Sequence, residues 1–179
     1  MLSNTILVGE RIMLRNIELS DCNEIYLSWL NDNCVNRFLE TRLYPQTMQT
    51  IIDFVTSIKN SDNSILFAII DKKSNQHIGN IKLGPIHQLY RYADISYFIG
   101  DKAYWNKGLG TEAVKLLCTY GLENLKLHRL QAGVIEGNDA SVKVLQKAGF
   151  VFEARLKDKF VLEEQFCDHL LYRIISDRD

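Results

Sequence analysis

Hydrophobic and polar positions along the chain follow two periods, one typical of strands and one typical of helices. Alternating or uninterrupted apolar residues predict strands at residues 7–17, 65–70, 76–83, 92–99, 129–135, 150–155 and 166–175. Apolar residues at helical spacing predict helices at residues 20–30, 47–58, 109–120 and 138–149. The predicted order is therefore β-α-α-β-β-β-α-β-α-β-β, an arrangement of the mixed α/β (α+β) class.

Turn and capping residues set the boundaries between these runs. Ser20 is expected to cap the first helix and Asn138 the last one, because both side chains can accept a hydrogen bond from a first-turn amide. Gly84-Pro85 is expected to end the strand before it, because proline has no amide hydrogen to donate. Residues 31–45 are predicted to be polar and irregular.

Composition narrows the class of protein. The chain has 179 residues and no internal repeat or linker, so we expect a single domain over 1–179 with its core at about 8–175. A net charge of -1 argues against a nucleic-acid partner that relies on bulk positive charge. The longest apolar run, 65–70, is too short to span a membrane, and no signal peptide is evident, so we expect a cytoplasmic protein. The cysteines are expected to be reduced thiols, and they are Cys22, Cys34, Cys118 and Cys167.

The stretch 105–111 lies between the predicted strand 92–99 and the longest predicted helix. It carries Gly108 and Gly110, which allow the backbone to approach a ligand closely. A helix N-terminus adds unpaired N–H groups and the positive end of the helix dipole. Together these features favour an anion site, most often for phosphate; the alternative is a plain turn at the start of a helix.

Two segments resemble the motifs of a known family. The first is a strand ending in Phe98-Ile99-Gly100, followed by Trp105-Asn106-Lys107-Gly108-Leu109-Gly110 and a helix. The second is Asn138-x-x-Ser141 followed by Lys147-Ala148-Gly149-Phe150. With this order of elements along essentially the whole chain, the sequence resembles the GNAT superfamily of acyl-CoA-dependent N-acetyltransferases. Its opening segment is similar to the subgroup of ribosomal-protein N-terminal acetyltransferases, through Gly9-Glu10-Arg11-Ile12-Met13-Leu14-Arg15 and Asp21.

The resemblance implies a mostly antiparallel central sheet flanked by helices, and an enzyme that moves acetyl from acetyl-CoA to a primary amine. The amine would attack the thioester directly in a ternary complex, without a covalent enzyme intermediate. Loop amides would hold the diphosphate, the preceding strand would guide the pantetheine arm, and Lys107 would either add charge or remain solvated. The implied acetyl-CoA contacts are Phe98, Ile99, Gly100, Asn106, Lys107, Gly108, Leu109, Gly110, Thr111 and Asn138.

Two positions depart from the family's pattern. Trp105 stands where the family often has Arg or Gln, which leaves the diphosphate to the backbone amides of the loop. Leu145 stands where many members carry a Tyr that protonates the departing thiolate. Leucine has no proton to give, so the general acid must lie elsewhere.

Ser141 and Asp94 are the candidate catalytic residues. In the related subgroup, a Ser at the position of Ser141 is proposed to hydrogen-bond the thiolate and act as the acid; the alternative is a plain first-turn serine. Asp94 lies on the same strand face as Ser96 and could accept the amine proton, directly or through water. Its alternative is a solvated carboxylate at a strand end. Glu136, and more weakly His87, are other candidates for the base.

The acceptor site is expected between residues 29–44 and 156–168. The run 77–86 is similar to GNAT members of bacterial surface-sugar pathways, so a small amine such as an amino-sugar nucleotide is the first prediction. A protein N-terminus is the alternative, and a non-catalytic acyl-CoA-binding sensor is an alternative of another class. The partners are thus acetyl-CoA and an amine, with a homodimer open. No His, Cys or Asp cluster has the spacing of metal ligands, so no metal is expected.

Overall fold

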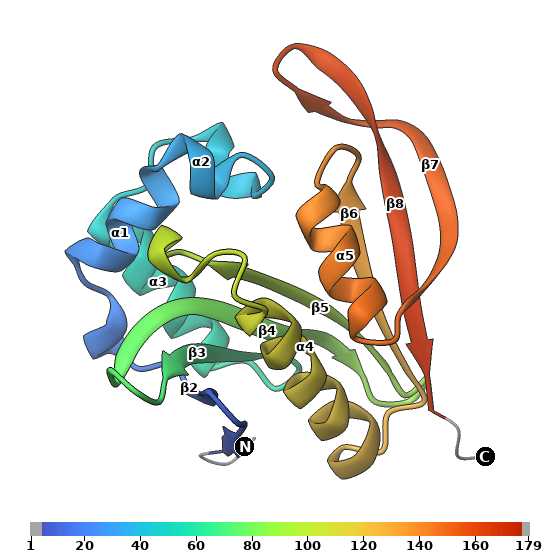
Figure 1. Ribbon diagram of the computed structural model, residues 1–179, viewed down its shortest axis with the longest axis horizontal. Coiled ribbons are helices and arrows are strands. Elements are labelled where there is room, and N and C mark those ends of the chain that lie inside the picture. Colours follow the sequence, from blue (N-terminus) through green and yellow to red (C-terminus); the bar gives the residue numbers. More distant parts are fainter. Residues whose placement is uncertain (1–4, 177–179) are drawn as a thin grey trace.

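Eight strands form one twisted sheet in the computed structural model, which describes residues 5–176 (Figure 1). The strand order is β1-β2-β3-β4-β5-β6-β8-β7, and every neighbouring pair is antiparallel except β5 and β6, which are parallel. The predicted mixed, mostly antiparallel sheet is therefore confirmed. The outer ends of the predicted domain, residues 1–4 and 177–179, lie outside the described part. The strands are β1 (Ile6–Val8), β2 (Ile12–Asn16), β3 (Ile65–Asp71), β4 (Gln76–His87), β5 (Tyr92–Ile99), β6 (Arg129–Ile135), β7 (Val151–Leu162) and β8 (Gln165–Ile175).

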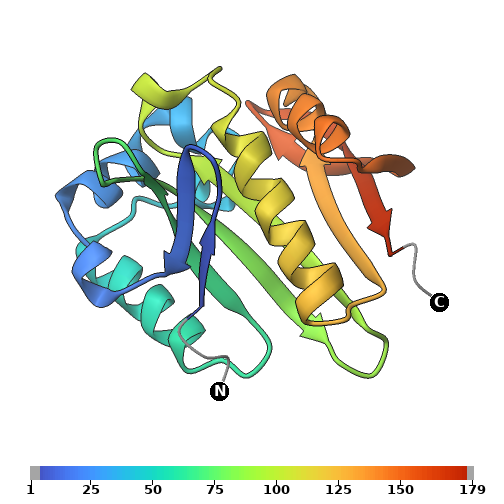
Figure 2. The ribbon, with the colours of Figure 1, turned by 60° about the horizontal axis from the view of Figure 1, so that its bottom comes forward.

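Helices cover both faces of this sheet. Two of them, α4 (Leu109–Thr119) and α5 (Asp139–Lys147), pack on one face, and α1 (Glu24–Asn31) and α3 (Met48–Lys59) pack on the other (Figure 2). The short helix α2 (Asn33–Asn36) follows α1 directly. One turn of π-helix continues α4, and single 3₁₀ turns lie at Leu19–Asp21, Glu40–Leu43 and Lys102–Tyr104.

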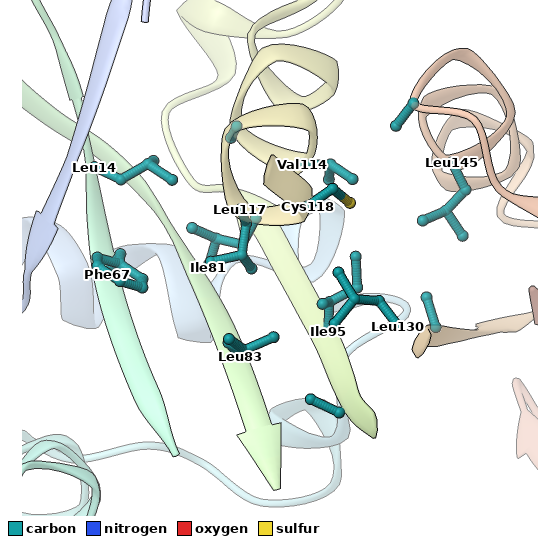
Figure 3. Close-up of a cluster of buried hydrophobic side chains, with 14 of the residues drawn as sticks. Leu14, Phe67, Ile81, Leu83, Ile95, Val114, Leu117, Cys118, Leu130 and Leu145 are labelled. Carbon is teal, nitrogen blue, oxygen red and sulfur yellow. The ribbon is translucent and has the colours of Figure 1, made fainter. Parts of the chain in front are cut away.

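The main core lies between the sheet and the α4 and α5 helices. Its strand residues come from alternating positions, because successive side chains of a strand point to opposite faces. The side chains labelled in Figure 3 come from the sheet and from both of these helices, and they are Leu14, Phe67, Ile81, Leu83, Ile95, Val114, Leu117, Cys118, Leu130 and Leu145. A second, smaller core on the opposite face joins α1 and α3 to the sheet and contains Tyr26, Trp29, Ile51, Val55 and Leu66, with Phe98 packed against it.

Several predicted boundaries agree with the structure. The strands predicted at 92–99 and 129–135 have the observed bounds of β5 and β6. Asn138 caps α5 as predicted, since its Oδ1 accepts the Ser141 N–H at 3.2 Å. The closing hairpin is also present, although β7 extends to Leu162 rather than ending near residue 155.

The single strand predicted at 7–17 is wrong, because the chain turns inside it. The strands β1 and β2 form a hairpin, and in its turn the Gly9 N–H donates to the Ile12 carbonyl at 2.9 Å. A Cβ at Gly9 would lie 2.6 Å from the Glu112 carboxylate, so a larger residue in the turn would displace the Glu112 side chain. The apolar alternation runs on across the turn, which is why the pattern did not reveal it.

Three other predicted boundaries differ from the structure. Ser20 does not cap the first helix: it lies inside a 3₁₀ turn, and the Asn23 side chain caps α1 by accepting from the Ile25 and Tyr26 amides. The stretch predicted as irregular contains α2 and a 3₁₀ turn. Gly84-Pro85 does not end its strand, since β4 continues to His87 with a shift of register at this point and a cis peptide bond.

Arg15 and Asp21, two residues of the opening segment, form a bidentate ion pair. Both guanidinium nitrogens donate to the carboxylate at 2.7 Å, and the Glu18 N–H donates to it at 2.8 Å. Asp21 is only 6% exposed. Burial raises the pKa of Asp21, but the bonds from Arg15 and from the Glu18 amide outweigh burial, so the pKa lies below its ordinary value. This pair therefore fixes the turn between β2 and α1.

Asp21→Asn is expected to reduce the free energy of unfolding at neutral pH by about 1 to 3 kcal/mol, because charge-assisted hydrogen bonds are lost. The folded pKa is depressed, so the stabilisation is complete above the ordinary value of 3.8 and is lost as pH falls through the folded pKa. Urea unfolding of both proteins across this range should show the difference shrinking in acid. Asp62→Asn, in an exposed turn, is the matched control. A difference that does not change with pH would contradict the assignment.

Candidate functional site

The strands β5 and β6 pair over a short distance and then part. Their parallel pairing covers only Tyr92–Asp94 against Arg129–Gln131 in the described chain, and Figure 2 shows the strands diverging beyond it. Beyond Asp94, the edge of β5 that faces β6 therefore has no strand partner. The helices α4 and α5 flank this split from the same face of the sheet (Figure 1).

Gly110 marks the place where β5, α4 and α5 meet. A Cβ built on Gly110 would lie 3.7 Å from Val144 of α5 and 3.9 Å from Ile99 of β5. These are ordinary contacts, so the glycine is not required by packing. Its lack of a side chain keeps the first turn of α4 open toward the split.

The N-terminus of α4 differs from those of the other α-helices in the described chain. A side-chain oxygen accepts from a first-turn amide in α1, α2, α3 and α5. The N-cap residue of α4 is Gly108, which has no side chain to do this. The loop before it has left-handed backbone at Asn106, with φ of 58°, and at Gly108, with φ of 77°. The first-turn N–H groups are thus left for another acceptor at the mouth of the split.

Arg11 ties this loop to the turn between β1 and β2. Its Nη1 donates to the Lys107 carbonyl at 2.7 Å, and its Nε donates to Glu112 at 2.9 Å. The other oxygen of Glu112 accepts the backbone N–H groups of Arg11 and Ile12. Burial raises the pKa of Glu112, but these hydrogen bonds lower it by more, so the pKa lies below its ordinary value and the carboxylate stays ionised. In the sequence, Arg11 stands out only as part of the opening segment that resembles the ribosomal-protein acetyltransferases. Its contact with Lys107 spans 96 residues, and such a contact leaves no local signal.

Trp105 and Gly100 fix the other end of the loop. The Trp105 indole N–H donates to the Ile99 carbonyl at 2.7 Å, and the ring packs against the second core. A Cβ at Gly100 would lie 2.1 Å from the Trp29 ring, so glycine is required there by packing. Phe98 also faces the second core, where its ring stacks on Tyr26. The side chains of Phe98 and Trp105 thus pack against the second core, and the missing side chain of Gly100 leaves room for the Trp29 ring.

Ser141 lies in the first turn of α5 and contacts a residue that the sequence did not single out. The Tyr97 hydroxyl oxygen lies 2.8 Å from Ser141 Oγ and 3.2 Å from the Ser141 carbonyl oxygen. Burial raises the pKa of Tyr97 to about 12, and the hydrogen bond with Ser141 only partly offsets that effect. Leu145, one turn further along, is fully buried in the main core. The strand period could have pointed to Tyr97, because it shares a face with the buried Ile95.

Asp94 lies at the closed end of the split, on the sheet face opposite to that of Tyr97 and Ser141. Its Oδ1 accepts the Gln131 side-chain amide at 2.8 Å, and Gln131 in turn accepts from Arg129 at 3.1 Å. Arg129 continues the row by pairing with Glu153. Asp94 and Ser141 are therefore not in contact, and a ligand lying between the strands would separate them.

The other candidate bases have partners elsewhere. The Glu136 carboxylate accepts from Arg155 at 2.9 Å, and the same guanidinium nitrogen bonds Asp168 at 3.0 Å. His87 stacks on Tyr92, with ring centroids 4.3 Å apart. Glu136 follows the end of β6 and could still reach the split, whereas His87 lies at the far end of the β4–β5 hairpin.

The two segments predicted to hold the acceptor do meet. Arg37, which directly follows α2, pairs with Glu163 of the β7–β8 turn at 2.9 Å. Arg42 donates to the Val161 carbonyl of β7 at 3.0 Å. These contacts join regions more than one hundred residues apart and bring the end of the closing hairpin over the α1–α2 side of the molecule.

An open pocket of about 900 Å³ lies on the other flank of the loop. Its lining comes from the β1–β2 turn, the β3–β4 turn and residues 101–109, and none comes from β6 or α5. Within residues 5–176, no group of three or more His, Cys, Asp or Glu residues could hold a metal ion. None of the described helices is long and apolar enough to cross a membrane.

Comparisons with known proteins agree with this geometry. A family model described as "Acetyltransferase (GNAT) domain" matches residues 11–151. The chain is 30% identical to the probable N-acetyltransferase YjcK of Bacillus subtilis, over 97% of this chain and 99% of that protein. It is 27% identical to the [ribosomal protein uS5]-alanine N-acetyltransferase of Escherichia coli, over 74% and 68% of the two chains. Its fold matches that of a spermidine N-acetyltransferase from Vibrio cholerae, solved with CoA and spermine, with a TM-score of 0.85, 19% identity and coverage of 95% and 98%.

The family match covers most of the chain, and the split between β5 and β6 with the open helix N-terminus beside it lies within the matched residues. GNAT proteins are acyltransferases that take acetyl-CoA as their co-substrate, and the matching relatives are named as N-acetyltransferases, so the chain is identified as an acyltransferase. The chain belongs to the GNAT family of acetyltransferases.

Proposed function

We propose that this acetyltransferase moves the acetyl group directly to the primary amine of a small molecule, in a ternary complex and without a covalent intermediate. The observation that carries the proposal is the uncapped N-terminus of α4 at the mouth of the split between β5 and β6. An anion bound there would hold one substrate in register with the strand edge. Positioning two substrates side by side supplies much of the rate in such a reaction.

Acetyl-CoA supplies an activated acetyl group and a diphosphate by which it can be held. The fit of this chain to the diphosphate rests on the first-turn amides of Leu109, Gly110 and Thr111 and on the left-handed loop residues before them. Lys107 would add charge to the phosphates, because its exposed ammonium is held only by a contact with the Tyr104 ring, 5.5 Å from the centroid. The backbone edge of residues 98–100 would guide the pantetheine arm, and Asn138 would add a contact from the start of α5.

Two polar groups on opposite faces of the sheet suit the two proton tasks. We assign Asp94 to the amine side, where its carboxylate, oriented by Gln131, accepts the proton directly or through water. We assign Ser141 to the thiolate side, where its hydroxyl stabilises the leaving sulfur. The separation of the two residues by the split fits a direct attack, in which the acceptor enters from one face and the donor lies between the strands.

The identity of the amine is the finer part of the proposal. The Arg37–Glu163 pair and the Arg42 contact join the closing hairpin to the segment after α2, which would leave less room for a large acceptor and so supports a small amine. An amino-sugar nucleotide stays the first candidate. The run 77–86 that suggested it lies in β4, and the buried apolar residues of this run belong to the main core. A protein N-terminus is the second candidate, favoured by the relative that acts on uS5, and a polyamine is favoured by the structural neighbour solved with spermine.

A homodimer and a cytoplasmic location complete the proposal. The strand β7 is the last in the sheet and exposes apolar side chains along its length, at Val151, Phe152, Leu156 and Val161. An exposed apolar edge of this kind favours pairing with a second copy. The cytoplasmic location rests on the use of acetyl-CoA, a metabolite of that compartment.

Gly108→Ala is expected to weaken acetyl-CoA binding about tenfold with little change in kcat, because an L-residue in left-handed backbone costs roughly 1 to 2 kcal/mol. Initial rates and calorimetric titration would measure KM and Kd. Gly149→Ala is the matched control, since Gly149 also has positive φ, at 96°, but ends α5. Equal loss of acetyl-CoA affinity in both variants would contradict a specific role for the loop.

Ser141→Ala should lower kcat about 10- to 100-fold, as expected for the loss of a hydrogen bond to a charged group, while acetyl-CoA affinity barely changes. Ser57→Ala, on the exposed side of α3, is the control for a helical serine. Turnover at the wild-type rate would rule out the assigned role of Ser141.

The acceptor is best identified by thiol release from acetyl-CoA with a panel of amines, namely amino-sugar nucleotides, polyamines and short peptides with free N-termini. We expect the highest kcat/KM for a small amine, because the contacts of Arg37 and Arg42 would leave less room for a large acceptor. A clear preference for peptides over every small amine would favour the protein N-terminus instead.

A further inference from the structure

Tyr97 reaches from β5 to the first turn of α5 and contacts Ser141 there. We propose that Tyr97 is a positioning residue: its hydroxyl donates to Ser141 Oγ and thereby directs the serine's own hydrogen at the leaving sulfur. This inference rests on the proposed function of Ser141. No proton leaves Tyr97 and no covalent bond is made, because the role is to fix the direction of one hydrogen bond.

The distances favour the serine oxygen as the main acceptor. The Tyr97 hydroxyl oxygen lies 2.8 Å from Ser141 Oγ and 3.2 Å from the Ser141 carbonyl oxygen. The shorter distance is typical of a good hydrogen bond between hydroxyls, and the longer one is a weaker contact. A hydroxyl has one hydrogen and two lone pairs, so a serine that accepts from Tyr97 keeps its hydrogen for another partner.

The surroundings of the pair leave few other roles for the serine hydroxyl. The backbone N–H of Ser141 is already used by Asn138 Oδ1, at 3.2 Å. Leu145, on the next turn, is fully buried and offers no polar atom. Tyr97 and Ser141 are both half-buried, and the raised pKa of Tyr97 keeps its phenol protonated at neutral pH, able to donate. In the proposed arrangement the Ser141 hydroxyl therefore keeps its hydrogen for a ligand in the split.

The opposite arrangement of the same atoms makes the opposite prediction. If Tyr97 donated to the Ser141 carbonyl, the serine hydroxyl would donate to Tyr97 and its hydrogen would be spent. Removing the phenol hydroxyl would then free the serine and leave turnover equal or faster. The effect of Tyr97→Phe on kcat thus separates the two arrangements, and this substitution removes one oxygen without changing the shape of the ring.

Tyr97→Phe, Ser141→Ala and the double variant should be compared in steady-state kinetics, with Tyr92→Phe on the same strand as control. We expect Tyr97→Phe to lower kcat about 3- to 10-fold, as for one neutral hydrogen bond, with KM for acetyl-CoA unchanged. The double variant should be no slower than Ser141→Ala alone, because Tyr97 acts through Ser141. Tyr97→Phe at or above the wild-type rate, or independent effects that multiply in the double variant, would overturn the proposal.

A second readout does not depend on turnover. The pKa of the thiol of bound CoA can be followed by the ultraviolet absorbance of the thiolate during pH titration. A hydrogen bond from Ser141 lowers this pKa, so it should rise in both Tyr97→Phe and Ser141→Ala. A rise in Ser141→Ala alone would overturn the role of Tyr97 and keep that of Ser141. If neither variant changes the pKa or kcat, the proposed function of Ser141 fails, and the positioning role of Tyr97 fails with it.

Discussion

The parting of β5 and β6 is the constraint on which the rest of the molecule depends. Within residues 5–176, these strands form the one parallel pair in an otherwise antiparallel sheet, and they stay together for only three residues of each strand. A parallel pair needs a crossover, and here α4 makes it. The crossover helix therefore starts beside the free edge of β5. The backbone groups of that edge and the first amides of α4 need partners, and a ligand with a diphosphate and an extended amide arm can supply them.

The residues around the split show how the rest of the fold maintains this geometry. Arg11 and Glu112 hold the loop from the side of β2, and Trp105 holds it from the side of the second core. The Trp29 ring occupies the space beside Gly100. The split is thus flanked by two packed cores, whose close packing resists changes in the positions of the strands.

The sequence predicted the elements whose signals are local. The bounds of β5 and β6, the Asn138 cap and the position of the glycine loop follow from period and capping chemistry. The hairpin inside residues 7–17 leaves no local signal because the strand period continues across its turn. Ser20 and Asn23 offer the same capping chemistry, so the sequence alone does not distinguish them as caps of α1. The Arg11 and Tyr97 contacts span 96 and 44 residues, and no local pattern encodes such distances.

The central claim is that acetyl-CoA lies in the split, with its diphosphate on the amides at the start of α4. Amide hydrogen exchange with and without saturating acetyl-CoA tests this claim without needing the acceptor. Slower exchange is predicted at residues 106–111 and along the free edge of β5, at residues 95–99. Protection confined to the pocket on the other flank, at residues 10–11 and 71–76, would contradict it.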